Sequence, residues 1–250
     1  MRIENSKAVI TGAASGLGLA TATLFRDHGA SVTILDRDPN GKDVAKSIGA
    51  HFVQTDVTDE SSVLNAIAEA SQTMDGLTVA VNCAGIATGE KTVGRDGPHS
   101  LSGFQRTIDI NLIGTFNVSR LAAAQMAKND ADDGAERGVI INTASIAAFD
   151  GQKGQAAYAA SKAGIAGMTL PMARDLASLG VRVMAIAPGI FMTPMLAGLG
   201  EDIKAGLAAS VTCPKRLGDP AEYARLAKFI VECGYLNGET IRIDGALRMQ

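Results

Sequence analysis

The stretch Thr11-Gly-Ala-Ala-Ser-Gly-Leu-Gly18 follows a short apolar run at residues 8–11 and leads into a segment of helical periodicity. Glycines in such a turn let the chain bend tightly, and the exposed N–H groups at the start of the helix attract a pyrophosphate. A glycine-rich turn also occurs in ordinary strand-to-helix connections. The strand before it, the helix after it and an acidic residue downstream favour a dinucleotide-binding turn that includes Gly12 and Gly18.

Beyond this turn, short apolar runs alternate with longer helical segments along the rest of the chain. This alternation predicts one doubly wound α/β domain of the Rossmann type over residues 1–250, with a seven-stranded parallel sheet. Ligands bind such sheets at the carboxyl ends of the strands, so functional residues are expected just after each strand. The predicted strands are 8–11, 31–35, 51–55, 77–81, 138–143, 181–186 and 240–243, and the predicted helices are 17–28, 42–48, 60–73, 100–128, 153–179, 201–209 and 220–232.

Composition excludes several classes of function. A net charge of −3 and a pI of about 5.6 provide no broad basic surface for nucleic acid or an anionic membrane. Every apolar run is shorter than the roughly 20 residues that cross a membrane. The three cysteines are too few for a disulfide framework, and no metal site is expected. The first strand follows the first residue too closely for a signal or transit peptide, so we expect a cytoplasmic protein.

Asp36 ends the second predicted strand, eighteen residues after Gly18. A carboxylate at this position accepts hydrogen bonds from the adenosine ribose and repels a 2′-phosphate, which favours NAD over NADP. The adjacent Arg37 favours NADP instead, because an arginine can accommodate that phosphate. Asp36 is also compatible with a solvated carboxylate that starts a turn.

Two further strand ends carry candidate cofactor contacts. Asp56 and Val57 follow the third predicted strand, where a carboxylate can hold the adenine amino group; Asp56 is equally suited to cap the helix near residue 60. Asn82-Cys83-Ala-Gly85 follows the fourth predicted strand, and its small residues let a cofactor lie close to the backbone. Cys83 alone is also compatible with a small buried apolar residue.

The segment Tyr158-Ala-Ala-Ser-Lys162 carries the proposed chemistry. On a helix, residues four apart share a face, so the Lys162 ammonium is expected near the phenol of Tyr158. A nearby cation lowers the pKa of a phenol, which would make Tyr158 a proton acceptor for an alcohol and a donor to a ketone. Ser145, at the end of the fifth predicted strand, has a hydroxyl that can polarise a carbonyl. A lone pair of this spacing would more often be structural, but here it follows a dinucleotide turn.

These motifs resemble the short-chain dehydrogenase/reductase family over essentially the whole chain. The matching segments are Thr-Gly-x-x-x-Gly-x-Gly at 11–18, Asn-x-Ala-Gly at 82–85, Asn111, Ser145, Tyr-x-x-x-Lys at 158–162 and Pro-Gly at 188–189. The resemblance implies that Lys162 binds the nicotinamide ribose and that Asn111 kinks its helix and holds a water in a proton relay. From the residues alone, Asn111 is equally compatible with a polar core residue.

Further segments are similar to the type II 3-hydroxyacyl-CoA dehydrogenases: residues 79–86, 138–145, 154–158, 167–171, 216–220 and 243–246. This subgroup also acts on hydroxysteroids. The resemblance implies a homotetramer that reversibly oxidises a 3-hydroxyacyl-CoA with NAD. A hydroxysteroid or other secondary-alcohol dehydrogenase is the alternative, and an NAD-binding protein without activity is a third possibility. The resemblance to this subgroup implies NAD contacts at Ser15, Leu17, Asp36, Asp56, Val57, Cys83, Tyr158, Lys162 and Phe191. It also implies substrate contacts at Ser145, Gln155 and Tyr158.

Two long loops, 86–103 and 188–218, are expected beside the site, and the second suits a mobile substrate lid. Four cations in these loops are candidates to contact the phosphates of a CoA ester, although each is also compatible with ordinary surface charge. They are Lys91, Arg95, Lys204 and Lys215.

Overall fold

A parallel β-sheet forms the centre of the molecule. The structure, a computed structural model, describes residues 1–132, 134–198 and 200–249. Seven strands pair in the order β3-β2-β1-β4-β7-β8-β9, and each neighbouring pair is parallel, which confirms the predicted doubly wound Rossmann fold. The strands are β1 (Lys7–Thr11), β2 (Ser31–Asp36), β3 (His51–Gln54), β4 (Val79–Asn82), β7 (Gly138–Thr143), β8 (Val181–Pro188) and β9 (Thr240–Ile243).

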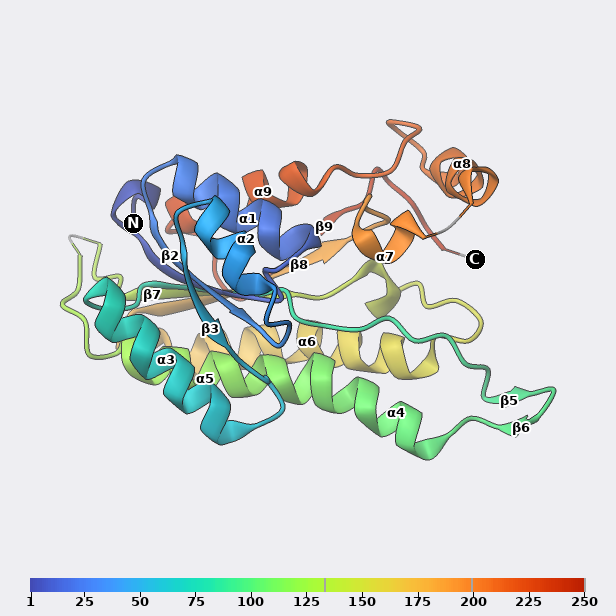
Figure 1. Cartoon of the computed structure of the whole chain (residues 1–250), viewed down its shortest axis with the longest axis horizontal. Coiled ribbons are helices and arrows are strands. Elements are labelled where there is room, and N and C mark those ends of the chain that lie inside the picture. Colours follow the sequence, from blue (N-terminus) through green and yellow to red (C-terminus); the bar gives the residue numbers. More distant parts are fainter. Residues whose placement is uncertain (133, 199, 250) are drawn as a thin grey trace.

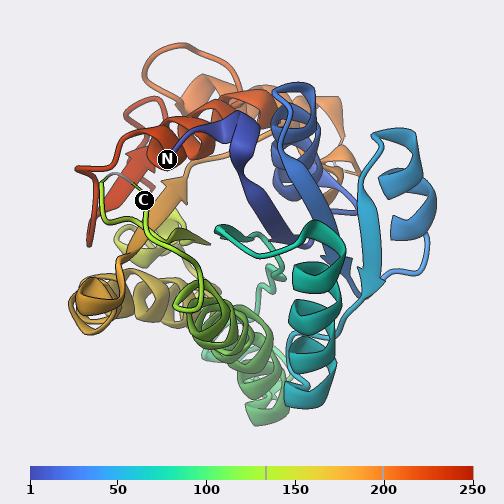
Figure 2. The same cartoon turned by 90° about the vertical axis from the view of Figure 1, so that its left-hand side faces the viewer.

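Helices cover both faces of the sheet (Figure 1). One face carries α1 (Gly16–Asp27), α2 (Gly41–Ser47) and α9 (Pro220–Glu232). The other face carries α3 (Glu60–Met74), α4 (Leu101–Ile108), α5 (Gly114–Met126) and α6 (Ala156–Asp175). Figure 2 shows the two helical layers on either side of the twisted strands, with blue α1 and red α9 opposite teal α3 and green α5. The short helices α7 (Pro194–Ala197) and α8 (Glu201–Ser210) lie beyond the carboxyl ends of the strands.

The core consists of two apolar layers, because successive side chains of a strand point to opposite faces of the sheet. In β1, Ala8 and Ile10 belong to the layer that contains Phe25 of α1 and Tyr223 of α9. Val9 points the other way, into the layer formed with α3 and α5. Both faces of β1 are therefore buried, as a central parallel strand requires.

The chain departs from the predicted elements at two places. The helix predicted over 100–128 is divided by a π-helical turn, Asp109–Ile113, which separates α4 from α5. The loop 86–103 contains a small antiparallel hairpin of β5 (Val93–Gly94) and β6 (Gly97–Pro98), which extends away from the body in Figure 1. Two-residue strands leave no periodic pattern, which explains why the hairpin was missed.

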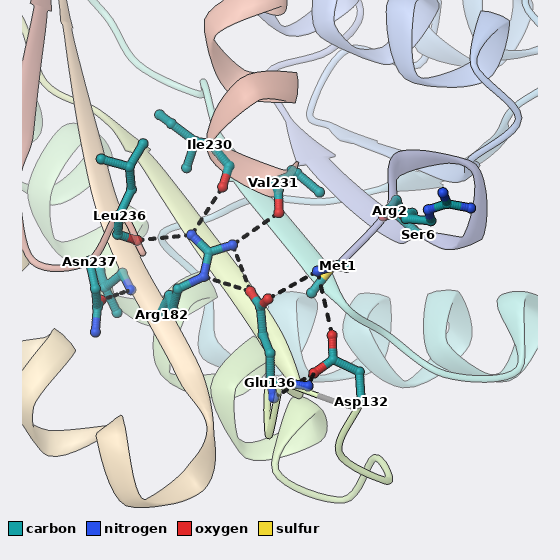
Figure 3. Close-up of polar contacts among 12 residues, drawn as sticks. Met1, Arg2, Ser6, Asp132, Glu136, Arg182, Ile230, Val231, Leu236 and Asn237 are labelled. Atoms are coloured by element: carbon teal, nitrogen blue, oxygen red, sulfur yellow. Dashed lines mark hydrogen bonds and ion pairs between the residues drawn. The ribbon is translucent and has the colours of Figure 1, made fainter. Parts of the chain in front are cut away.

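A buried arginine fixes the end of the sheet opposite the carboxyl ends (Figure 3). The Arg182 guanidinium, near the start of β8, donates to Glu136 over 2.6 Å and to the carbonyls of Ile230, Val231 and Leu236 over 2.9–3.0 Å. Ile230 and Val231 lie in the last turn of α9, where carbonyls lack helical partners. Arg182 thereby joins β8 to α9 and sets the position from which β8 runs toward the site.

Among the described residues, no helix is both long and apolar enough to cross a membrane.

Candidate active site

A cavity of about 550 Å³ opens at the carboxyl ends of the strands. Its lining comes from the segments that follow β1, β2, β3, β4, β7 and β8, together with α6, α7 and α8. Of the residues predicted for catalysis and for contacts with NAD or the acyl group, all of them described, Asn111 is outside this lining, as are the four loop cations considered below. The predicted residues that line the cavity are Gly12, Ser15, Leu17, Gly18, Asp36, Asp56, Val57, Cys83, Ser145, Gln155, Tyr158, Lys162 and Phe191.

The glycine turn after β1 packs directly against the turn after β4. Gly12 has φ +64°, and a Cβ atom there would lie 2.7 Å from the Cα of Ala84, so only glycine fits. The hydroxyl of Thr11 accepts hydrogen bonds from the N–H groups of Cys83 and Ala84, both at 3.1 Å. A Cβ at Gly18 would lie 2.5 Å from the carbonyl oxygen of Gly12. These contacts hold the first turn of α1 against the cavity, where its N–H groups can receive a pyrophosphate.

Asp36 closes β2 beside this turn. One carboxylate oxygen accepts the N–H of Ala14 over 2.9 Å, and the other accepts the N–H of Asp38 over 3.0 Å. The carboxylate is therefore held in place rather than freely solvated, and it lines the cavity together with Arg37. Its remaining lone pairs can accept ribose hydroxyls.

Asp56 is held by Thr58, whose N–H and hydroxyl donate to one carboxylate oxygen over 2.9 and 2.7 Å. These hydrogen bonds lower the pKa of Asp56, so its side chain is ionised at neutrality. The cap of α3 is Asp59, which accepts the N–H of Ser62 over 2.7 Å. The capping role considered for Asp56 is therefore wrong.

Val57 is fixed against α5. A Cβ at Gly114 would lie 2.6 Å from a methyl carbon of Val57, and the amide of Asn117 donates to the Val57 carbonyl over 3.1 Å. This close approach requires glycine in the first turn of α5. It places the Val57 side chain, which is 8% exposed, at the cavity wall.

Cys83 faces a pair of hydroxyls, that of Thr143 at the cavity wall and that of the fully buried Tyr223. Its Sγ lies 3.6 Å from the Thr143 hydroxyl and 3.7 Å from the hydroxyl of Tyr223, and these two hydroxyls are 2.7 Å apart. Burial raises the pKa of the Cys83 thiol, which keeps it protonated and unreactive at neutrality. Tyr223 reaches this point from α9, and its ring belongs to the apolar core.

Lys162 and Tyr158 lie together on α6, as their spacing predicts. The Lys162 Nζ atom is 5.8 Å from the centre of the Tyr158 ring and donates to the carbonyl of Thr143 over 2.7 Å. Burial lowers the pKa of Lys162 to about 8. The backbone at the end of β7 therefore holds the ammonium in place beside the phenol.

The expected lowering of the Tyr158 pKa is wrong for this structure. Burial raises the pKa of the phenol, and a hydrogen bond with Ser145 opposes the rise only in part. The physical reason is that removing a phenolate from water outweighs the interactions that stabilise it. Ser145 follows β7, is 7% exposed, and accepts the N–H of Ala147 over 3.1 Å. At neutral pH Tyr158 is therefore a protonated phenol.

Asn111 lies behind the cavity in the π-helical turn. Its side chain accepts the N–H of Ile86 over 2.8 Å and donates to the Ile86 carbonyl over 2.9 Å and to Ser161 over 3.0 Å. A Cβ at Gly85 would lie 3.1 Å from the Asn111 oxygen and 3.7 Å from the Lys162 nitrogen. Asn111 therefore joins the turn after β4 to α6, and only the small Gly85 separates it from Lys162.

The four loop cations lie away from this cavity. Lys204 and Lys215 line a second hollow, and Lys204 pairs with Glu201 over 2.9 Å. Lys91 and Arg95 belong to the exposed stretch around the β5–β6 hairpin. These cations were predicted beside the substrate because they belong to the two loops, but none of the four lines the cavity.

Several lining residues were missed by sequence reasoning. Thr143 could have been found as a strand-end polar residue two positions before Ser145. Thr193, Leu207 and Met249 carry no such signal, because they come from irregular or short segments whose course depends on the packed fold. Within residues 1–132, 134–198 and 200–249, no three His, Cys, Asp or Glu side chains are grouped to hold a metal ion.

The site combines a dinucleotide turn with a phenol, an ammonium and a serine on one cavity, the equipment of an alcohol dehydrogenase. The family described as short chain dehydrogenase matches residues 6–204, and the chain belongs to this family. It is an oxidoreductase that acts on CH–OH groups with a nicotinamide cofactor.

Individual relatives match over the full length. The 3-hydroxyacyl-CoA dehydrogenase type-2 of Homo sapiens is 56% identical over 253 residues, covering 99% of this chain and 97% of the human protein. The protein of the same name from Drosophila melanogaster is 52% identical, with 99% of each chain covered. The crystal structure of 3-hydroxyacyl-CoA dehydrogenase type-2 from Mycobacterium avium has a TM-score of 0.95 at 45% identity, covering 99% of this chain and 98% of that chain.

Proposed function

We propose that this enzyme reversibly oxidises a 3-hydroxyacyl-CoA to the 3-oxoacyl-CoA with NAD. The observation that carries the proposal is the convergence of Tyr158, Lys162 and Ser145 on the cavity that Asp36 also lines. The relatives above are named 3-hydroxyacyl-CoA dehydrogenase type-2, and the similarity covers nearly their full length, which supports an acyl-CoA substrate.

The residues present fit a nicotinamide dinucleotide. The glycine turn places helix N–H groups beside the cavity for the pyrophosphate, and Ser15, Leu17 and Gly18 belong to that turn. The fixed carboxylate of Asp36 would accept hydrogen bonds from the hydroxyls of the adenosine ribose. We assign NAD rather than NADP on this basis. Asp56, Val57, Cys83 and Phe191 would complete the cofactor walls.

When bound, the nicotinamide supplies the acceptor for the hydride that leaves the alcohol carbon. For oxidation Tyr158 first loses its own proton, and the phenolate oxygen then takes the hydroxyl proton of the alcohol; in reduction the phenol gives its proton to the carbonyl oxygen. Ser145 donates a hydrogen bond to the same substrate oxygen, and Gln155 borders the substrate from the start of α6. Lys162 would bind the nicotinamide ribose, and Asn111, held beside it, would anchor the water of the proton relay.

The segment 188–218 would act as a lid over the substrate, and residue 199 within it lies outside the described residues. Phe191, Thr193 and Leu207 of this segment line the cavity. Glycine and proline at 188–189, 194 and 214 punctuate it, as expected of a segment that closes over a ligand.

We further propose a homotetramer in the cytoplasm. Leu101, Ile113 and Phe116 of the α4–α5 region are 79%, 50% and 46% exposed, and a second copy would cover such apolar side chains. The cysteines Cys83, Cys213 and Cys233 are free, as a reducing compartment requires.

The test is the specificity constant kcat/KM with NAD for a matched set of alcohols. The set contains 3-hydroxybutyryl-CoA, its N-acetylcysteamine thioester, a hydroxysteroid and a simple secondary alcohol. We expect the CoA ester to have the highest value, with the truncated thioester sharing its chemistry but losing the contacts of the CoA nucleotide. A CoA ester that is not turned over, beside a hydroxysteroid or simple alcohol that is, would transfer the assignment to that substrate class.

A further inference from the structure

The segment after β9, residues 244–249, returns to the cavity and contributes Met249 to its lining. Met249 lines the cavity, together with the apolar residues Ile146, Leu196 and Leu207. In Figure 1 this segment runs to the side of the molecule where α7 and α8 lie. The cofactor and catalytic roles proposed above use no side chain from residues 244–249.

An ion-pair network centred on Arg242 holds the segment. The Arg242 guanidinium donates to Asp150 over 2.5 Å, to Asp244 over 2.7 Å and to the carbonyl of Leu247 over 3.1 Å. Its Cζ atom also lies 5.5 Å from the centre of the Phe149 ring. The Asp150, Asp244 and Arg242 side chains are 16%, 8% and 22% exposed, so the network is shielded from water. Arg242 therefore joins the segment to the loop that follows Ser145.

Three other contacts fix the same segment from its opposite side. The N–H of Cys213 donates to the carbonyl of Gly245 over 3.1 Å, and the Thr212 hydroxyl donates to the carbonyl of Ala246 over 3.2 Å. A Cβ at Gly189, which lines the cavity, would lie 2.8 Å from the Cα of Asp244. The segment is thus packed between the loop after β8, the loop after α8 and the loop after β7.

We propose that Met249 is a wall of the acyl part of the substrate cavity and limits the length and branching of the acyl chain. Arg242 is the positioning residue that holds this wall. The proposal rests on the proposed function, because it assigns the acyl group of a 3-hydroxyacyl-CoA to this end of the cavity. A flexible thioether suits the role, since methionine fills irregular apolar space without polar demands.

The physical consequence is a change in chain-length preference. Met249→Ala removes part of an apolar wall and opens space for more methylene groups, each of which raises kcat/KM by about fourfold where it becomes buried. Met249→Trp fills the space and acts in the opposite direction. Met249→Leu, of similar volume, is the conservative variant and should keep the wild-type preference.

The experiment measures kcat and KM with NAD for 3-hydroxybutyryl-CoA and 3-hydroxyoctanoyl-CoA. The kcat/KM for 3-hydroxyoctanoyl-CoA divided by that for 3-hydroxybutyryl-CoA should rise at least about fourfold in Met249→Ala and fall at least about fourfold in Met249→Trp. Arg242→Ala should shift the ratio in the same direction as Met249→Ala, mainly through KM, and Arg242→Lys should restore part of the wild-type ratio. The matched control is Arg225→Ala, an exposed arginine of α9 that also pairs with a carboxylate.

Unchanged ratios in Met249→Ala and Met249→Trp would overturn this proposal while leaving the proposed function intact. A wild-type enzyme that turns over neither CoA ester would instead contradict the proposed function. In that case the same variants are measured on secondary alcohols of increasing chain length, where a shifted ratio supports the wall and an unshifted ratio refutes it.

Discussion

Replacing Asp36 by asparagine isolates the electrostatic basis of cofactor choice. Asparagine removes the negative charge and keeps one oxygen, which can accept the N–H of Ala14 that lies 2.9 Å from the Asp36 carboxylate, but it gives up the acceptor for the N–H of Asp38. Asp36→Asn should therefore leave the glycine turn in place. Its expected effect is a narrower gap between the kcat/KM values measured with NAD and with NADP.

The size of that gap follows from the charges involved. A ribose 2′-phosphate carries about −1.5 to −2 charges at neutral pH. With water-like screening and a separation of about 5 Å, each unit charge costs about 0.8 kcal/mol beside a carboxylate. The total of about 1.2–1.7 kcal/mol corresponds to roughly a tenfold preference for NAD. Asp36 is only partly exposed, so weaker screening increases this repulsion, whereas the neighbouring Arg37 cation reduces it.

The assay compares steady-state kcat/KM for both cofactors in wild type, Asp36→Asn and the control Arg37→Ala. Arg37 is a neighbouring cation on the same cavity, so its removal should widen the preference for NAD instead of narrowing it. Equal efficiency of the wild-type enzyme with NAD and NADP would refute the reasoning. So would an unchanged ratio in Asp36→Asn.

Four further predictions concern catalysis, pH, cofactor binding and stability. Tyr158→Phe should lower kcat by a factor of roughly 10²–10⁴ while the dissociation constant of NAD, measured by calorimetry, stays within a few-fold. Because burial raises the pKa of Tyr158, kcat/KM for alcohol oxidation should increase with pH through the alkaline range, and oxidation that is fastest below neutrality would contradict this assignment. Gly12→Ala should weaken NAD binding because its Cβ would meet Ala84 at 2.7 Å, whereas Gly167→Ala, with no atom within 4 Å, serves as the control. Arg182→Ala should lower the free energy of unfolding in urea by about 1–3 kcal/mol, because the buried carbonyls of Ile230, Val231 and Leu236 lose their donor while Glu136 keeps the Met1 ammonium at 3.3 Å; an unchanged midpoint would show that the network is dispensable.

Much of the fold could be predicted because parallel strands and their helices leave periodic patterns. The predicted strand 138–143 and helix 220–232 agree with β7 and α9 to the residue. The π-helical turn at Asp109–Ile113 could not be predicted from periodicity, because its cause is tertiary. Asn111 bonds the backbone of Ile86, 25 residues earlier, and no local pattern reports that contact.

Site residues that follow strand ends could be predicted from the sequence. Properties that depend on burial in the folded chain, such as the direction of a pKa shift, could not. The proximity of Tyr158 and Lys162 follows from helical spacing, and the structure brings them together. The direction of the Tyr158 pKa does not follow from spacing, since it depends on how completely the folded chain removes the phenol from water. The contribution of Met249 depends likewise on Arg242 and Asp150, which are 92 residues apart in the chain and meet only in the packed molecule.

The most direct test of the central claim is a single-turnover reaction of the enzyme with 3-hydroxybutyryl-CoA and NAD. NADH formation is followed by absorbance and 3-oxobutyryl-CoA by mass spectrometry. The account predicts one equivalent of each product per turnover in wild type, and no burst of either in Tyr158→Phe although that variant still binds NAD. NADH formation by Tyr158→Phe at the wild-type rate, or no 3-oxobutyryl-CoA from the wild-type enzyme, would contradict the account.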